Sequence, residues 1–462
     1  MSHFPPEKQD PEVQHELEEK RLLRKLDIRL LPLCAFIYLL CYLDRSNIGN
    51  ARTLNLKTED DIMHSIGMTQ HEYLIALMVF LIAYCLFEAP SNILLKKLSP
   101  SRWIAFLMFS FGACTMIIGG SHNYAMLTAF RFLLGMFEAG LFPGLVYYTT
   151  FWYKREECSL RVAVFFASAT LAGAFGGAIA FGVGHMNMTA GLEGWRWLFI
   201  LEGMLSVIFS VVVLFVMPDY PDTASWLTPE EQILAAHRLG VDSGATPTSS
   251  SRIGWAEVRE TLTTKRLYIH YLIFFLAGPP FSSLSLFTPS ITAGLGFKDL
   301  EAQLMTVPPY ASAYVCMIIA AIVADRYNAR GIVTFVSGII GAVGFIGSAT
   351  LSPEAFNARY GCLIIASSGA FSCVSPLIGW LAGNTFSSGV TGLAIALNIS
   401  LAAPGQITGV WIYKAEEAQI GFPTGHWTNA GCLLGLALSS LALQFYYRRQ
   451  NKHLSTGPKF IL

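Results

Sequence analysis

The first long apolar run of the chain, residues 30–49, reads LLPLCAFIYLLCYLDRSNIG. It is long enough to cross a bilayer as a helix, because about 20 residues span the hydrocarbon core. Near its end, however, the run carries an adjacent acid and base, Asp44 and Arg45. A charge at bilayer depth costs roughly 2.5–3.5 kcal/mol on insertion scales, so such residues usually face a wet cavity, form pairs or take part in transport. The run therefore predicts a membrane protein with a polar interior.

The composition of the whole chain supports this prediction. Of the 462 residues, 53% are hydrophobic and only 13% are charged, whereas ordinary soluble domains have about 25% charged residues. The net charge is zero, which gives no indication of a nucleic-acid partner. The nine cysteines show no metal-ligand spacing and no phosphate-binding glycine loop is present, so we expect no metal and no cofactor. Residues 1–20 are polar and charged, and we therefore expect no cleavable signal peptide.

Further apolar runs of similar length follow the first one. We expect twelve spans, at residues 30–49, 72–94, 103–120, 124–147, 161–184, 196–217, 268–290, 303–324, 331–350, 360–381, 389–412 and 427–447. The predicted fold class is an all-α membrane protein with two bundles of six helices each. The expected divisions are a cytoplasmic segment at 1–29, a first bundle at 30–217, a cytoplasmic loop at 218–267, a second bundle at 268–447 and a cytoplasmic tail at 448–462. Two halves of similar length predict a central cavity where they meet.

The distribution of Lys and Arg predicts the orientation. These residues are concentrated before span one, in the loops after spans two, four and eight, and after span twelve. Since cytoplasmic loops carry the excess of positive charge, we expect both termini in the cytoplasm. We expect the plasma membrane as the location, and a surface helix at residues 227–239 within the central loop.

Several motifs resemble the major facilitator superfamily over nearly the whole chain, and within it the fungal anion:cation symporters of the allantoate and nicotinate permease type. They are LDRSNIGNAR at 43–52, EAPSN at 88–92, RFLLG at 131–135 with EAG at 138–140, and WRWLF at 195–199 with EG at 202–203. The superfamily's loop motif is degraded after span two, and a trimmed form follows span eight. The resemblance gives Asp325, Arg326 and Arg330 of that trimmed motif a gating or structural role. Span five lacks the Gly-Pro step of the drug antiporters, which disfavours a drug exporter.

The charged residues of spans one and four fall at similar depth. Asp44 lies roughly 21 Å above the cytoplasmic end of its span, and Arg131 lies roughly 10 Å below the outer end of span four, at about 1.5 Å per residue. The two residues can therefore meet if both face one cavity. Arg131 and Glu138 are seven residues apart and share a helix face. The cluster is either a permanent ion pair that holds the bundle together or an arginine clamp beside titratable carboxylates.

The resemblance implies roles for these charges. Asp44 and Glu138 correspond to proton carriers, Arg45 to the residue that contacts the substrate carboxylate, and Arg131 to a residue that tunes Asp44. The implied function is proton-coupled uptake, by alternating access, of a small organic anion such as nicotinate, allantoate or pantothenate. The expected partners are this anion, protons and the lipid bilayer, and we expect a monomer rather than an enzyme of any kind. The alternatives are an exporter of a secondary metabolite and a nutrient sensor that does not transport.

Other polar residues receive separate interpretations. We expect Glu88 to make a structural or gating contact with loop cations, and Glu202 to pack and pair beside Arg196. Broken polar helices often line transporter sites, so Ser282 in span seven and Asn398 in span eleven are candidate substrate ligands. Asn187 begins an Asn-Met-Thr glycosylation sequence in the short loop between spans five and six.

Overall fold

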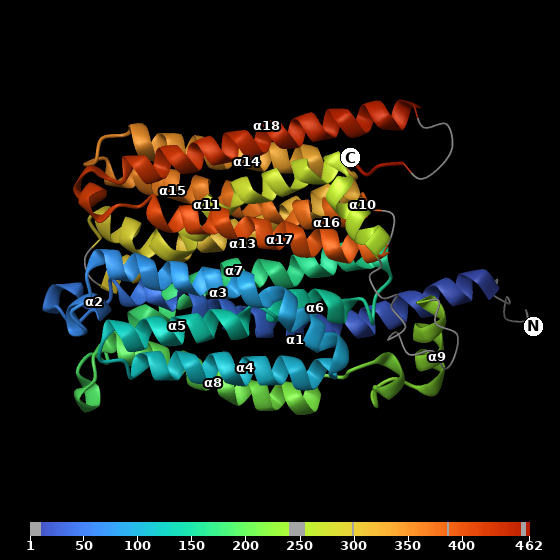
Figure 1. The fold of residues 1–462 in the computed structure, drawn as a ribbon, viewed down its shortest axis with the longest axis horizontal. Coiled ribbons are helices and arrows are strands. Elements are labelled where there is room, and N and C mark those ends of the chain that lie inside the picture. The colour runs from blue at the N-terminus through green and yellow to red at the C-terminus, as the bar shows by residue number, and fades with distance from the viewer. Residues whose placement is uncertain (1–10, 240–254, 298–299, 386–387, 454–458) are drawn as a thin grey trace, which may run out of the picture.

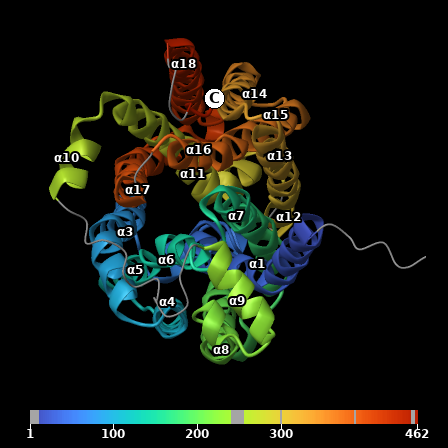
Figure 2. The same ribbon diagram turned by 90° about the vertical axis from the view of Figure 1, so that its right-hand side faces the viewer.

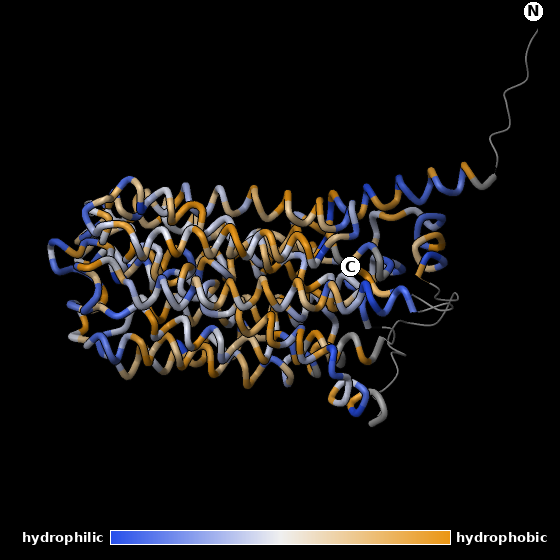
Figure 3. The backbone as a smooth tube through the Cα atoms, turned by 90° about the horizontal axis from the view of Figure 1, so that it is seen from above, coloured by the Kyte–Doolittle hydropathy of each residue, from blue (hydrophilic) through white to orange (hydrophobic). Residues whose placement is uncertain are grey.

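The protein is a bundle of long helices in a computed structural model, which describes residues 11–239, 255–297, 300–385, 388–453 and 459–462. The helices run along one common axis (Figure 1). Among the described residues, twelve helical segments are long and apolar enough to cross a membrane. Hydrophobic residues dominate the middle of the bundle and hydrophilic ones gather at its two ends (Figure 3). The expected all-α class with twelve spans is confirmed.

The first half packs around three pairs of helices, α4 with α8, α1 with α7, and α3 with α5. Short helices accompany the spans in the loops on the side away from the termini. The helices of this half are α1 (Pro11–Ala51), α2 (Ile62–Ser65), α3 (Gln70–Lys97), α4 (Pro100–Gly119), α5 (Tyr124–Glu138), α6 (Leu141–Thr149), α7 (Arg155–Gly184) and α8 (Gly194–Val216).

The second half repeats this arrangement, with α14 packed on α18, α11 on α17, and α13 on α15. Its helices are α11 (Lys265–Gly294), α12 (Leu300–Leu304), α13 (Val307–Arg326), α14 (Arg330–Thr350), α15 (Phe356–Ser372), α16 (Val374–Gly383), α17 (Ser388–Trp411) and α18 (Pro423–His453). The two halves lie side by side, as the end view of Figure 2 shows.

The central loop contains two short helices. The first, α9 (Pro229–Arg238), confirms the surface helix expected at 227–239, while α10 (Trp255–Thr263) was not expected. Ion pairs tie α9 to the first half: Lys25 Nζ lies 2.6 Å from Glu231, and Arg238 Nη2 lies 2.6 Å from Glu157. The loop residues 240–254 fall outside the described part of the chain.

Three spans are interrupted among the described residues: span eight, between α12 and α13, and spans four and ten, which are the fourth spans of their halves. Span four divides into α5 and α6 beside Pro143, and span ten divides into α15 and α16 beside Pro376. Proline has no N–H and clashes with the carbonyl four residues earlier, which places the breaks near residues 139 and 372. The spans expected to be broken, seven and eleven, are instead continuous through their prolines as α11 and α17.

The halves meet tightly at the end of the bundle away from the termini. Gln303 Nε2 donates to the carbonyl of Asn50 at 3.1 Å and to Thr53 Oγ1 at 2.7 Å. Gly177 of α7 lies so close to α12 that an added Cβ would come within 2.6 Å of the Gln303 carbonyl. Both termini lie at the opposite end (Figure 1). Close backbone approach through small residues is the usual way that membrane helices pack, and here it closes one mouth of the bundle.

The segment Phe460–Leu462 lies against the termini-side end of the second half. Trp380 Nε1 donates to the Ile461 carbonyl at 2.9 Å, and Asn384 exchanges two hydrogen bonds with the Ile461 backbone at 2.8 and 3.1 Å. The backbone N–H of Arg330 donates to the Leu462 carbonyl at 2.7 Å. These residues therefore connect α14, α16 and the tail.

Candidate functional site

The neighbours Asp44 and Arg45 point in different directions from α1. Consecutive residues on a helix lie about 100° apart, since a turn contains 3.6 residues, so only one of the pair can face the cavity between the halves. Arg45 does so: its Nη2 donates to Gln406 Oε1 of α17 at 2.5 Å. Its guanidinium also lies over the rings of Tyr42, Phe80 and Tyr84, at 5.6, 5.2 and 5.3 Å from their centroids. Arg45 thus reaches from the first half to the second.

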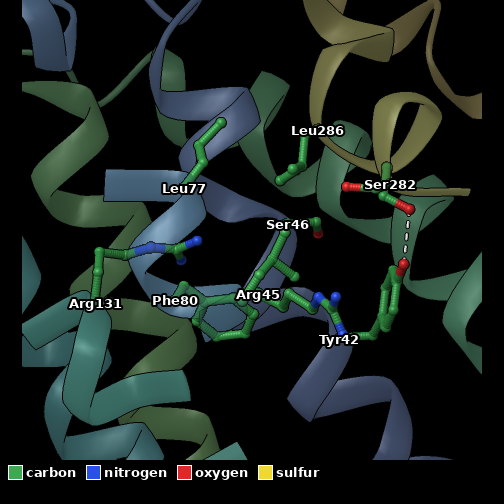
Figure 4. A pocket seen from close by; sticks show the side chains of 10 residues that line it. Tyr42, Arg45, Ser46, Leu77, Phe80, Arg131, Ser282 and Leu286 are labelled. Carbon is green, nitrogen blue, oxygen red and sulfur yellow. Dashed lines mark hydrogen bonds between the residues drawn. The ribbon is translucent and has the colours of Figure 1, made fainter. Parts of the chain in front are cut away.

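Arg131 of α5 faces the same space from the other side of Phe80 (Figure 4). Its guanidinium lies 4.6 Å from the centroid of that ring, and its side chain is buried. Its Nε and Nη1 have no hydrogen-bond partner among the described residues. One cavity contains both arginines and is lined by Tyr42, Arg45, Ser46, Leu77, Phe80, Leu81, Arg131, Ser282, Ser285 and Leu286. Two guanidiniums with unused donors make this cavity suited to an anion.

A second cavity continues from Arg45 toward the end that holds the termini. Aromatic side chains from both halves form a large part of its wall, Arg45 is shared with the first cavity, and Gln406 is a further polar group. Its lining residues are Tyr38, Arg45, Tyr84, Phe142, Phe166, Phe274, Ala277, Gly278, Phe281, Val374, Ile378, Ile399, Ala402 and Gln406. The wall therefore matches an organic molecule with an apolar body and an anionic head near Arg45.

Asp44 turns away from this space, toward α8. Its Oδ2 accepts a hydrogen bond from Ser206 Oγ at 2.7 Å, and the residue is fully buried. No ion pair joins Asp44 to Arg131 within the described chain, because Arg131 lies beside Phe80 instead. The expected meeting of Asp44 and Arg131 is therefore wrong; equal depth in the bilayer does not place two residues on facing sides of their helices.

Glu138 is the last residue of α5, directly at the break in span four. It is fully buried, and neither carboxyl oxygen has a hydrogen-bond partner among the described residues. The charged groups that act on it electrostatically are Arg45, Asp44 and Arg131. Glu138 is thus the acid on which the arginines of the cavity act.

Glu88 contacts the second half rather than a described loop cation. Ser400 Oγ of α17 donates to Glu88 Oε2 at 3.5 Å, and Glu88 Oε1 has no partner in the described residues. The side chains of Lys96 and Lys97, its expected partners, fall outside the description. The contact crosses between the halves on the termini side of the cavity, where a gating residue would lie.

The expected pairing of Glu202 with Arg196 is also wrong. Arg196 binds Glu193 and donates to the carbonyls of Gly119 and Ser121 at 3.1 and 2.7 Å. Glu202 instead accepts a hydrogen bond from Asn47 Nδ2 at 2.5 Å. Glu202 lies six residues after Arg196 on α8. It therefore contacts α1 near Asp44, whereas Arg196 contacts groups at the start of α8.

The trimmed loop motif after span eight forms a local ion pair. Arg330 Nη2 lies 2.7 Å from Asp325 Oδ1, and Arg330 Nη1 donates to the Gly379 carbonyl of α16. Arg326 is exposed. Asp325 and Arg330 thereby fix the α13–α14 turn to α16, while Arg326 has no such contact.

Three remaining candidates have different surroundings. Ser282 lines the arginine cavity, and its hydroxyl has no partner in the described residues. Asn398 is buried but lines neither cavity; on the same helix, Ile399 and Gln406 do. Asn187 donates its amide to Asp60 at 2.7 Å and accepts from the Gly194 N–H at 2.9 Å. Glycosylation of Asn187 stays a prediction.

Outside the spans, two acids in a loop, Asp60 and Asp61, form hydrogen bonds that shift pKa values. The hydroxyl of Thr58 and the amide of Asn187 lower the pKa of Asp60 by hydrogen bonding. Asp61 caps α2 and binds His64, which raises the pKa of that imidazole. No group of three or more metal-ligating side chains is placed to hold a metal ion in the described parts of the chain.

Sequence reasoning missed Gln406 as the partner of Arg45, and Ser285, whose hydroxyl lies 2.7 Å from the Tyr42 hydroxyl. The polarity of Gln406 inside an apolar run was the available signal. The direction of both side chains depends on the rotation of α11 and α17 about their axes. Close packing fixes this rotation, because an added Cβ on Gly278 of α11 would lie 2.8 Å from the backbone nitrogen of Gln406.

Two bundles around a cavity that contains two arginines are typical of a membrane transporter. A profile described as Major Facilitator Superfamily matches residues 34–410, and the chain belongs to that superfamily. The relatives include MFS transporter prlL from a fungal species (strain NRRL 50135), 59% identical over 434 residues, which covers 94% of this chain and 87% of the relative. MFS-type transporter cnsO of Penicillium expansum is 33% identical over 446 residues, covering 94% and 84%.

Among solved structures, the chain is similar to a bacterial homologue of the human lysosomal transporter Spinster, in an inward-facing and unoccupied conformation. The TM-score is 0.67 at 14% identity, over 93% of this chain and 98% of the other. At this identity the likeness shows the fold alone. The anion:cation symporter subfamily is a finer assignment than these comparisons make.

Proposed function

We propose that the protein is a proton-coupled importer of a small organic anion, related to the anion:cation symporters. The observation that supports this most is the pair of guanidiniums, those of the partly buried Arg45 and the buried Arg131, in one cavity between the halves. Neither arginine is paired with a carboxylate among the described residues, and both lie against Phe80. Glu138 acts electrostatically on both arginines but forms an ion pair with neither among the described residues. A charge in low dielectric without an ion-pair partner is costly, so we infer that an anionic substrate completes this site.

The wall of the second cavity narrows the substrate class. Six aromatic rings, those of Tyr38, Tyr84, Phe142, Phe166, Phe274 and Phe281, surround the path from Arg45 toward the termini side. Such a wall binds an aromatic or apolar body better than a highly polar one. Among the acids that the resemblance implies, we therefore favour a nicotinate-like aromatic monocarboxylate over the polar allantoate.

The coupling step joins Arg45 to Glu138. In the empty site the guanidinium of Arg45 acts on the Glu138 carboxylate. A bound substrate carboxylate pairs with Arg45. The positive charge of Arg45 then stabilises the ionised form of Glu138 less. A carboxylate without a nearby cation in low dielectric binds a proton more readily. Substrate and proton therefore favour each other, which is the requirement for symport.

Orientation and organisation complete the proposal. The termini, α9 and α10 lie at one end of the bundle (Figure 1), and we place that end in the cytoplasm of a plasma-membrane monomer. The chain is then divided into a cytoplasmic segment at 1–29, a first bundle at 30–217, a cytoplasmic loop at 218–267, a second bundle at 268–447 and a cytoplasmic tail at 448–462. The cavity path toward the termini opens inward, and the contact of Gln303 with Asn50 and Thr53 closes the outer mouth.

The experiment is uptake of labelled monocarboxylates into cells that express the chain, at outside pH 5 and pH 7.5. We expect greater uptake at pH 5 and loss of accumulation when a protonophore is added. Arg45→Lys should reduce uptake, while Arg102→Lys, which changes an exposed arginine, should not. Greater efflux than uptake from preloaded cells would assign the chain to the exporters, and no movement of any acid in the panel would contradict the anion site.

A further inference from the structure

Two buried acids, Asp44 of α1 and Glu202 of α8, lie together on the side of α1 that faces away from the cavity. Asp44 is 0% exposed and Glu202 is 3% exposed. Ser206, one turn along α8 from Glu202, donates to Asp44 at 2.7 Å. Asn47, one turn along α1 from Asp44, donates to Glu202 at 2.5 Å. A side chain of α8 therefore binds the acid of α1, and a side chain of α1 binds the acid of α8. The two carboxyl groups also interact electrostatically.

The hydrogen bonds of this cluster leave three oxygens without a donor among the described residues. Asp44 Oδ1, Asn47 Oδ1 and Glu202 Oε1 are buried oxygens without a hydrogen-bond partner among the described residues. The amide of Asn47 is an independent indication, because its fully buried oxygen needs a donor that no described side chain supplies. An ionised carboxylate only accepts hydrogen bonds, whereas a protonated carboxylic acid also donates one. A proton on either acid provides one further donor for these oxygens.

The charges around the cluster do not neutralise it. On α8, Arg196 is committed to Glu193 and two carbonyls, and on α7, Arg161 pairs with Asp27 at 2.7 Å. The groups on the far side of α1 and on α5 are Arg45, Cys41, Arg131 and Glu138; the neighbouring thiol on α4 is Cys114. No cation within the described chain forms an ion pair with Asp44 or Glu202. Two adjacent carboxylates in low dielectric cannot both stay ionised at modest cost.

We propose that Asp44 and Glu202 form one proton-storing pair that binds a proton outside the substrate cavity. The proton passes from water to a carboxyl oxygen, and no other bond is made or broken. This inference rests on the proposed function, since it names a second proton site for the same transporter. The pair lies on the opposite face of α1 from Arg45, so protonation and substrate binding both act on the position of one helix. Glu138 and the pair then have separate roles.

Infrared spectroscopy of the full chain in lipid nanodiscs tests the pair directly. A protonated carboxylic acid has a C=O stretching band that is absent from the carboxylate. We expect a titrating band of this kind that Glu202→Gln and Asp44→Asn each change, and that Ser206→Ala shifts in frequency. Glu354→Gln, an exposed acid, should leave the band unchanged. A spectrum identical to wild type in both Glu202→Gln and Asp44→Asn would overturn the proposal.

Transport measurements separate this proposal from the proposed function. In proteoliposomes, Glu202→Gln should lower uptake driven by a pH gradient at least tenfold while leaving exchange of labelled for unlabelled substrate. If wild type responds to the pH gradient and Glu202→Gln responds equally, the proton pair is wrong but symport stands. If wild-type uptake does not respond to the pH gradient, symport is wrong.

Replacement of Na⁺ by choline should not change uptake; loss of uptake would assign the pair to a metal cation. Should Glu202→Gln fail to fold, Glu202→Asp should retain the band at a shifted frequency, and loss of the band would contradict the pair.

Discussion

Substitution of Arg45 by lysine tests the anion site with the charge kept constant. In the structure, one guanidinium nitrogen of Arg45 is bound to Gln406 at 2.5 Å, which leaves the remaining N–H groups for a substrate. A lysine ammonium is compact and lacks the planar fork, so it cannot hold Gln406 and two carboxylate oxygens in the same geometry. The change should remove one charge-assisted hydrogen bond, worth about 1.5–3 kcal/mol. That energy corresponds to a loss of roughly 10- to 150-fold in affinity.

The assay is binding of the preferred acid to purified protein, with the thermal midpoint measured in parallel. Arg45→Lys should weaken binding by the stated factor and change the midpoint little, because the lysine stem still packs against Tyr42 and Tyr84. Arg102→Lys serves as the matched control on the surface. Normal binding by Arg45→Lys, in a protein that is folded and monodisperse, would refute the assignment of Arg45 to the substrate. If Arg131→Lys alone loses binding, Arg131 is the anchor.

Four further predictions concern other parts of the molecule. Asp44→Asn and Glu138→Gln should each abolish concentrative uptake yet retain exchange, measured with labelled substrate; full accumulation in both would remove these acids from coupling. Gln406→Glu should place a carboxylate beside Arg45 and weaken substrate binding at least tenfold in the same binding assay. Asn384→Ala should remove two hydrogen bonds to Ile461 and lower the free energy of unfolding by about 1–3 kcal/mol, seen as a lower thermal midpoint than that of Asn357→Ala. Asp61 raises the pKa of His64. The Asp61–His64 pair therefore stabilises the folded protein fully below the unfolded pKa of about 6.5, and this stabilisation is lost as pH rises through the folded pKa of His64. His64→Gln should accordingly lower the thermal midpoint at pH 5.5 and have little effect at pH 8.5.

The fold was predictable because the signals are local. A run such as residues 30–49 must form a helix in a bilayer, whatever its neighbours are, since its backbone has no other partner there. The twelve expected spans therefore agree with the observed helices to within a few residues, apart from the extension of α1 and α18 beyond the membrane. Polar interruptions were interpreted less well: the breaks occur beside Pro143 and Pro376, whereas α17 passes through Pro404 as a continuous helix.

The site was predictable only in part, because rotation of each helix decides which neighbour faces the cavity. Sequence placed Asp44 and Arg45 together within span one but did not assign them to separate faces of the helix. It paired Glu202 with Arg196 by proximity along the chain, while the true contact is with Asn47 of another helix. Contacts between the halves, such as Arg45 with Gln406 and Glu88 with Ser400, join residues more than 300 positions apart. Such pairs depend on packing of both bundles, which no local pattern contains.

The central claim is that an organic anion enters together with protons. The most direct measurement uses purified protein in proteoliposomes, with a labelled aromatic monocarboxylate outside and an acidic outside pH. We predict accumulation above the outside concentration, collapse of that accumulation by a protonophore, and acidification of the vesicle interior in step with uptake. Equal, non-concentrative uptake with and without the pH gradient, and no proton movement during uptake, would contradict the account.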